Sequence, residues 1–182
     1  LTSHDNYTDE YVIWVQTAEG TEPVTVEELE YEPINDDSLE YSVHSFESEE
    51  AMLVAYLDYL EETDPSILSG WNFEDFDLTY LLQRLDNLDS NRSGAQLEPE
   101  RLTRLDYWKT SNWGPDIKGR TPIDLLYAYK RTQFTEKDSY RLDSIGEDEL
   151  GVGKETYIGD IGGLWEDDPK RLLEYNLRDV EI

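Results

Sequence analysis

An asparagine and an aspartate, Asn72 and Asp77, stand where the sequence predicts that a strand ends and a helix begins. Residues 67–71 form a short apolar run, and apolar residues recur at helical spacing over residues 76–85. Open α/β sheets place their chemistry at such strand ends, because side chains there project into a crevice between the covering helices. Asp77 could therefore bind a metal ion while Asn72 contacts a substrate. The alternative is that the acids here only complement the positive end of the helix.

A tyrosine and a second aspartate, Tyr175 and Asp179, lie four residues apart near the end of the chain. Asp168 and Pro169 are a typical helix cap followed by a proline at the first helical position, so they predict a helix over the residues that follow. Residues i and i+4 share one face of a helix, so the hydroxyl and the carboxylate project together. This spacing fits a hydrogen-bonded surface pair as well as a pair of site residues.

Both places resemble motifs of one enzyme family. Residues 70–77, Gly-Trp-Asn-Phe-Glu-Asp-Phe-Asp, resemble the second exonuclease motif of family-B DNA polymerases, and residues 175–179 resemble the third, Y-x-x-x-D. Stretches within residues 119–154 resemble the region between these motifs. The chain is therefore similar to the 3′-5′ exonuclease domain of these polymerases, with the two motifs in the family's order.

The resemblance implies a chemical role for each matching residue. Asp77 and Asp179 would bind catalytic metal ions, Mg²⁺ or Mn²⁺, and Tyr175 would orient the attacking water. Asn72 and Phe76 would contact the substrate, the 3′ end of single-stranded DNA. Two divalent metals activate a water and stabilise the leaving oxygen in phosphodiester hydrolysis, and such hard cations prefer carboxylate and water ligands. The implied function is proofreading by hydrolysis of DNA.

The family's first motif, D-x-E, is not found at its expected place ahead of the first predicted strand. Residues 179–181 spell Asp-Val-Glu, but they belong to the helix of the third motif. We therefore expect residues 1–182 to form a single exonuclease-like domain without its first strand, from a protein whose polymerase domain lies in cis and binds primer–template DNA. The two-metal site would be incomplete, and the chain alone inactive or nearly so.

Two other functions fit the same motifs. A free-standing exonuclease of the same superfamily, acting on DNA or RNA, would carry them without a polymerase domain. A degenerate exonuclease-like module that binds single strands or a partner protein would carry them with its first motif lost. The full gene sequence would distinguish these two possibilities from a polymerase.

The chain is strongly acidic, with 43 Asp and Glu residues against 15 Lys and Arg and a net charge of −28. Self-repulsion of this kind fades at about 1 M salt, where the Debye length is about 3 Å. The composition resembles that of haloarchaeal proteins, so we expect a halophilic archaeal source. Because the chain has no cysteine and no apolar run of transmembrane length, we expect a cytoplasmic protein with no membrane partner.

One region reverses this charge. Residues 101–141 contain nine Lys or Arg residues against five acids, with Tyr107, Trp108 and Trp113 among them. Basic side chains and aromatic rings suit a phosphate backbone and stacked bases. Arg120 and Lys130 are therefore candidate DNA-binding residues. The alternative is that the basic residues form salt bridges with acids of the same chain.

The remaining patterns predict an α/β fold with a mixed sheet flanked by helices, compatible with the ribonuclease-H-like (DnaQ-like) fold that the resemblance implies. We expect strands over residues 1–3, 11–15 and 41–46 and a helix capped by Ser48. Later segments predict a polar loop, a turn and two helices, the first of them capped by Thr121 ahead of Pro122. Their ranges are, in order, residues 86–99, 113–116, 123–130 and about 139–150.

Overall fold

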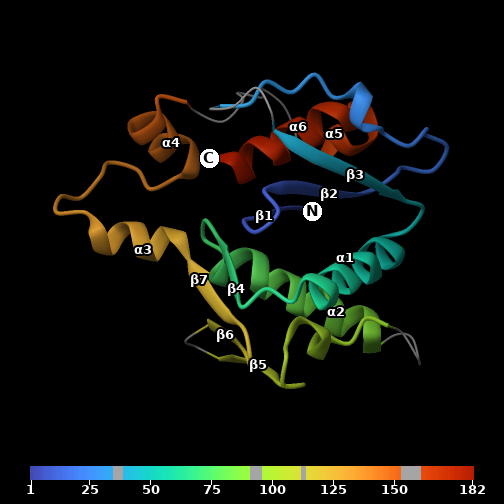
Figure 1. Ribbon diagram of the computed structural model, residues 1–182, viewed down its shortest axis with the longest axis horizontal. Helices are drawn as coiled ribbons and strands as arrows, with labels where there is room; N and C mark the ends of the chain where they lie inside the picture. Colours follow the sequence, from blue (N-terminus) through green and yellow to red (C-terminus); the bar gives the residue numbers. More distant parts are fainter. Residues whose placement is uncertain (35–38, 91–95, 112–113, 153–160) are drawn as a thin grey trace. The chain divides into compact units, whose positions relative to one another are not determined.

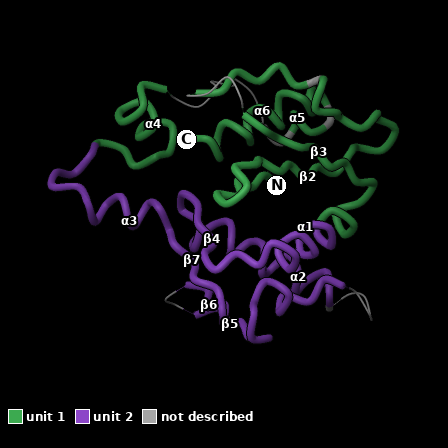
Figure 2. Tube along the Cα trace, in the orientation of Figure 1, with its two compact units in different colours: residues 1–52, 138–182 green, residues 53–137 purple. Residues whose placement is uncertain are grey.

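The computed structural model describes residues 1–34, 39–90, 96–111, 114–152 and 161–182 (Figure 1). Trp113 and residues 153 and 154, which carried part of the sequence predictions, lie outside these ranges. The chain divides into two compact units (Figure 2). The first unit contains residues 1–52 and 138–182, and the second contains residues 53–137. Each unit has its own strands and its own buried side chains.

The first unit is built on a three-stranded mixed sheet in the order β1-β2-β3. Strand β1 (Thr2–Asp5) runs antiparallel to β2 (Glu10–Gln16), and β3 (Glu40–Phe46) runs parallel to β2. The central strand β2 has five consecutive buried residues, as expected of a strand covered on both faces. The three predicted strands are confirmed, although the first extends to Asp5.

Helices of the first unit pack their apolar residues against this sheet. Leu173 and Leu177 of α6 (Pro169–Glu181) lie in one buried cluster with Ile13 and Val15 of β2. The unit also contains the short 3₁₀ helix η1 (Val26–Glu28), α4 (Leu142–Leu150) and α5 (Ile161–Asp167). The cluster therefore fixes α6, the helix of the third predicted motif, on β2.

The second unit contains two strand pairs. Strand β4 (Ile67–Gly70) pairs in parallel with β7 (Thr121–Asp124), while β5 (Trp108–Ser111) and β6 (Gly114–Ile117) are antiparallel. The other elements are the end of α1 (Glu49–Thr63), the π-helical turn η2 (Glu74–Leu78), α2 (Thr79–Ser90), the 3₁₀ helix η3 (Pro99–Leu102) and α3 (Leu125–Thr132). Leucines from these helices are buried at Leu57, Leu60, Leu78, Leu82, Leu85 and Leu102.

Several helix boundaries confirm the sequence predictions. The Ser48 hydroxyl accepts the Ala51 N–H at 3.2 Å at the start of α1. Asp168 caps α6 ahead of Pro169, and its carboxylate accepts the Arg171 N–H at 3.2 Å. These side-chain oxygens satisfy N–H groups that have no partner within the helix. Local chemistry is thus enough to locate both helix starts.

The predicted cap at Thr121 is wrong. Residues 121–124 form β7, and Asp124 caps the helix that begins at Leu125. A proline is tolerated in β7 because Thr121 donates its N–H to the Ser66 carbonyl at 2.8 Å, which directs the nitrogen of Pro122 away from β4. The pairing partner lies 55 residues away, so local cap chemistry favoured the wrong reading.

Two further predictions between residues 86 and 117 are corrected. Residues 86–90 of the predicted polar loop belong to α2, Pro99 begins η3, and residues 91–95 lie outside the described ranges. Residues 114–116 belong to strand β6 and not to a turn, and the β5–β6 pair was not predicted. The Gly114-Pro115 pair is a common turn signal, and Gly114 has a φ of 97°, a left-handed conformation that glycine tolerates within the strand. Finally, α4 begins at Leu142, a few residues after the predicted start.

Candidate active site

The second motif folds as an irregular turn between β4 and α2. Asn72 has a φ of 60°, a left-handed conformation that asparagine tolerates better than most residues. The chain then forms a π turn in which the Leu78 N–H donates to the Phe73 carbonyl, five residues back, at 2.9 Å. Leu78 is buried at the end of this turn, whereas Phe76 and Asp77 are exposed. The turn therefore presents the predicted metal ligand while it anchors the backbone beside it.

The acids around this turn differ in their surroundings. Burial raises the pKa of Glu74, and the neighbouring Asp124 and Asp75 raise it further. Asp75 accepts a hydrogen bond from the Tyr127 hydroxyl at 2.6 Å, and this bond raises the pKa of the tyrosine. Glu74 is half-buried, whereas Asp75 and Asp77 are both exposed on the turn.

Asp124 is a residue of this region that the sequence predictions missed. Its carboxylate is buried and accepts the Glu74 N–H at 3.1 Å, as well as the N–H groups of Leu126 and Tyr127 at 2.9 and 3.4 Å. An aspartate directly before an apolar helical run is a signal for a helix cap and could have located it. Its contact with Glu74, 50 residues away, could not be read from that signal.

Residues 175–179, the predicted third motif, lie on α6 of the first unit, and the helix that the sequence predicts there is confirmed. Tyr175 and Asp179 occupy successive turns of a regular helix, and both side chains are half-buried. The buried Leu173 and Leu177 fix the opposite stripe of the helix in the core. The third motif thus depends on ordinary helix geometry, unlike the irregular turn of the second motif.

A buried polar cluster, formed by Tyr31, Arg178 and Glu181, holds the end of α6. The Glu181 side chain is 7% exposed, and its carboxylate accepts hydrogen bonds from the Tyr31 hydroxyl and, at 2.6 Å, from the Ile34 N–H. Arg178 donates to the Glu32 carbonyl at 2.6 Å and lies 4.8 Å from the centre of the Tyr31 ring. Burial and the bond to Glu181 raise the pKa of Tyr31. Glu181 therefore serves the fold, although residues 179–181 spell D-x-E.

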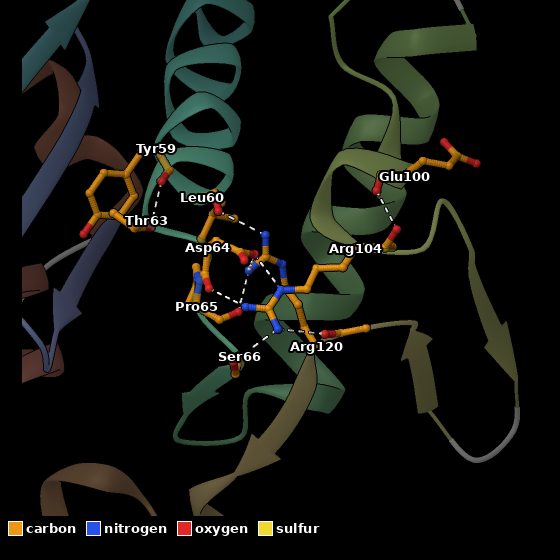
Figure 3. A network of polar contacts seen from close by, with 11 residues as sticks. Tyr59, Leu60, Thr63, Asp64, Pro65, Ser66, Glu100, Arg104 and Arg120 are labelled. Carbon is orange, nitrogen blue, oxygen red and sulfur yellow. Dashed lines mark hydrogen bonds and ion pairs between the residues drawn. The ribbon is translucent and has the colours of Figure 1, made fainter.

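Arg120, a predicted DNA-binding residue, lies inside the second unit. Its side chain is 2% exposed. The guanidinium group donates to the carbonyl oxygens of Leu60 and Pro65 at 3.0 and 2.5 Å, and it forms an ion pair with the Asp64 carboxylate at 3.2 Å (Figure 3). Arg104 approaches the same Asp64 carboxylate at 2.5 Å, and this bond lowers the pKa of Asp64. Together the two arginines fix the connection between α1 and β4.

Other basic residues of this region pair with acids of the same chain. Arg101 contacts Asp58 and Glu61, each at 2.6 Å, and Lys118 contacts Asp116 at 2.9 Å. This geometry favours the salt-bridge alternative for these residues and for Arg120. Lys130 is exposed, and its Nζ atom lies 6.0 Å from the centre of the Tyr127 ring. DNA binding by any basic residue of the region stays a prediction.

The sequence pattern of the family described as DNA polymerase family B, exonuclease domain, matches residues 2–145. The chain belongs to this family. The matched residues include the turn that carries Asn72 and Asp77, whereas Tyr175 and Asp179 lie beyond them. The mixed α/β architecture of the chain is consistent with such an exonuclease domain.

The relatives of this exonuclease domain are much longer DNA polymerases. It is 36% identical over 138 residues to a DNA-directed DNA polymerase of Escherichia phage RB69, a match that covers 74% of this chain and 15% of the relative. It is 33% identical over 141 residues to the corresponding enzyme of Enterobacteria phage T4, covering 75% and 16%. A Pyrococcus glycovorans DNA polymerase is 28% identical over 142 residues, covering 74% and 17%. Because such relatives come from phages and archaea alike, the haloarchaeal source stays a prediction.

The predicted site residues of this exonuclease domain divide between the two units. Asn72, Phe76 and Asp77 belong to the second unit, and Tyr175 and Asp179 belong to the first. Across the described residues, no three or more His, Cys, Asp or Glu side chains form a group that could hold a metal ion. Carboxylates are the right donors for Mg²⁺, and the metal-binding roles of Asp77 and Asp179 stay predictions. In the same ranges, no helix is both long and apolar enough to cross a membrane.

Proposed function

We propose that the chain is part of the proofreading 3′-5′ exonuclease of a family-B DNA polymerase, with a ribonuclease-H-like fold. The observation that carries this proposal is the π turn at the end of β4, which leaves Asp77 exposed within the family match. Side chains at the carboxyl end of a strand are well placed for chemistry in α/β sheets. The polymerase activity of the whole protein and its primer–template DNA belong to the same proposal, as does a cytoplasmic location in a halophilic archaeon.

Each predicted site residue has a role in this proposal. Asp77 and Asp179 supply carboxylates for Mg²⁺ or Mn²⁺, and Tyr175 orients a water for attack on the terminal phosphodiester. Asn72 and Phe76 contact the 3′ end of single-stranded DNA. Phe76 is 66% exposed, so its ring is available to stack on a base. Further acids from the longer protein, in the D-x-E motif of the family, are required to complete the metal site.

Lys130 is the basic residue that we propose as a DNA contact. It is exposed at the end of α3, where a cation can approach a phosphate. Arg120 is left out of the proposed contacts because its guanidinium group is buried among backbone carbonyls. Lys130→Ala should weaken single-strand binding and reduce its salt dependence. An unchanged affinity and salt slope would remove Lys130 from the proposal.

The test uses the protein encoded by the whole gene, in high potassium chloride. Release of nucleotides from a 3′-labelled single strand is measured against Mg²⁺ concentration, for wild type and for Asp77→Ala and Asp179→Ala. Both substitutions should abolish release, because they remove ligands from the proposed site. Asp86→Ala, which removes another exposed acid of the second unit, is the matched control and should retain activity.

Two results would contradict the proposed function. Continued nucleotide release after Asp77→Ala or Asp179→Ala would show that the substituted residue does not belong to the active site. A folded wild-type protein that binds single strands and releases no nucleotide would instead support the binding-module alternative. The same preparation incubated with a primer–template and nucleotides tests the polymerase part of the proposal.

A further inference from the structure

The two parallel strands of the second unit end side by side. In the β4–β7 register Gly70 lies opposite Asp124, so the turn of the second motif and the start of α3 leave the strand pair at the same end. Asp124 is 4% exposed, and its carboxylate lies between these two segments. One oxygen accepts the N–H of Glu74, and the other accepts the N–H groups of Leu126 and Tyr127.

The Asp124 carboxylate accepts a hydrogen bond from the first N–H group of the turn. Glu74 is the first residue of η2, and N–H groups in the first turn of a helix have no carbonyl within that helix to accept them. Asn72, two residues earlier, has a left-handed conformation, so the chain changes direction immediately before this point. A second bond, from the Tyr127 hydroxyl to Asp75, joins the same two segments.

We propose that Asp124 is a positioning residue for the second motif: by holding the Glu74 N–H, it fixes the π turn and hence the direction of the Asp77 carboxylate. Asp124 acts through the turn and touches neither substrate nor metal. Its catalytic consequence rests on the proposed exonuclease function, whereas its effect on the turn does not. Capping of α3 and fixation of the turn are two separate tasks of one side chain.

Substitution by serine separates the two tasks. A serine at position 124 keeps a hydroxyl that can cap α3, because serine is among the preferred capping residues. Its side chain is one bond shorter than that of aspartate and carries one oxygen, so it cannot also reach the Glu74 N–H. Asp124→Ala removes both contacts. Asp124→Asn keeps two polar atoms of the same shape, with one oxygen as the acceptor, and tests whether the conservative variant rescues the turn.

The experiment is amide hydrogen exchange on the whole gene product, read separately for residues 73–78 and for residues 125–132. Asp124→Ser should speed exchange at the Glu74 amide by about tenfold or more, the effect of losing a bond to a charged acceptor, and leave α3 close to wild type. Asp124→Ala should speed both segments, and Asp124→Asn should lie between wild type and serine at Glu74. Unchanged exchange at Glu74 in the serine variant would overturn the proposal. Ser48→Ala, which removes the cap of α1, is the control and should leave residues 73–78 unaffected.

Kinetics with single-stranded DNA and Mg²⁺ test the catalytic consequence. Asp124→Ser should lower kcat by about tenfold or more and leave KM for DNA close to wild type, because misdirection of Asp77 affects the reaction more than strand binding. A wild-type kcat in a serine variant with a loosened turn would overturn the catalytic role of Asp124. A wild type without nuclease activity would count against the proposed function alone, because hydrogen exchange decides the positioning role independently.

Discussion

The two predicted motifs of this chain present their aspartates in different ways. Asp179 lies on a regular helix whose neighbours Leu173 and Leu177 are buried and whose end is held by the Tyr31–Arg178–Glu181 cluster. Asp77 lies on a π turn whose backbone is held by hydrogen bonds, including one to the buried Asp124. Packing can position a regular helix as a rigid body, whereas an irregular turn needs bonds to its own backbone. Substitutions in the two regions should therefore have different effects on the structure around each aspartate.

The largest effects are expected from the buried leucines, one in each region. Leu177→Ala and Leu78→Ala should each lower the free energy of unfolding by about 2–5 kcal/mol, because each leaves a cavity in a buried site. Urea unfolding followed by circular dichroism measures this loss. Leu150→Ala, at a side chain that is 47% exposed, is the control and should cost less than about 0.5 kcal/mol. Losses in the two regions no larger than in the control would contradict the described cores.

Removal of Glu181 should have the next largest effect, and it should act only on α6. Glu181→Ala leaves the Tyr31 hydroxyl, the Ile34 N–H and Arg178 without this acceptor, which should cost about 3 kcal/mol. The loss should be accompanied by faster hydrogen exchange at the end of α6 and unchanged exchange in the π turn. Glu147→Ala, an exposed acid of the same unit, serves as the control. Equal loosening of the π turn would mean that the two motifs are not held independently.

Loss of the α6 cap should have a smaller effect. Asp168→Ala removes the acceptor of the Arg171 N–H and should cost about 1 kcal/mol, the usual value of a helix cap. Asp168→Ser should restore most of that stability, since serine also caps helices. Urea unfolding of the three proteins measures both changes. An alanine variant as stable as wild type would show that packing alone fixes the start of α6.

The smallest effect concerns pH. The pKa of Tyr31 is raised above its ordinary value of 10.0, so its neutral form is favoured in the folded state. The raised pKa of Tyr31 stabilises the folded state fully below pH 10. This stabilisation is lost as the pH rises above 10, because the unfolded chain releases the tyrosine proton first. Tyr31→Phe should therefore reduce the fall in the urea midpoint between about pH 8 and about pH 11. An equally steep fall in the variant would assign the alkaline sensitivity to other tyrosines, such as Tyr11 and Tyr41, whose pKa values are also raised.

Features that depend on neighbouring residues were predictable from the sequence. The caps at Ser48 and Asp168 follow from side-chain oxygens placed just before apolar helical runs. Gly151 ends α4 with a φ of 72°, as a glycine after the last helical turn commonly does. The central strand β2 was recognisable because its buried residues are consecutive and β-branched or aromatic. These elements are determined over a few residues.

Features that depend on distant partners were not predictable. Arg120 counted as surface charge in a basic stretch, yet it is buried because Leu60 and Pro65 supply carbonyl oxygens from 60 and 55 residues away. Residues 121–122 look like the start of a helix until their pairing with β4 is known. Asp124 could be recognised as a cap but not as the partner of Glu74. Sequence patterns therefore predicted the strand–helix bend that carries Asp77 and the helix that carries Asp179, and missed the contact that holds the bend.

The π turn also bears on how the length of the second motif can change. A π turn holds one residue more than an α turn over the same hydrogen-bonded span, so it behaves as a single-residue insertion in a helix. Deletion of one residue between Asn72 and Asp77 would let the turn close as an ordinary α-helix. With β4 and Asn72 held in place, Asp77 and Leu78 would then rotate together by about 100° around the helix axis, so the Asp77 carboxylate would change its direction and Leu78 would leave its buried place. The number of residues between Asn72 and Asp77 thus matters for the function of this motif. A gap at this place in an alignment would indicate a change in the direction of the Asp77 carboxylate, and not the variation in length that a surface loop tolerates.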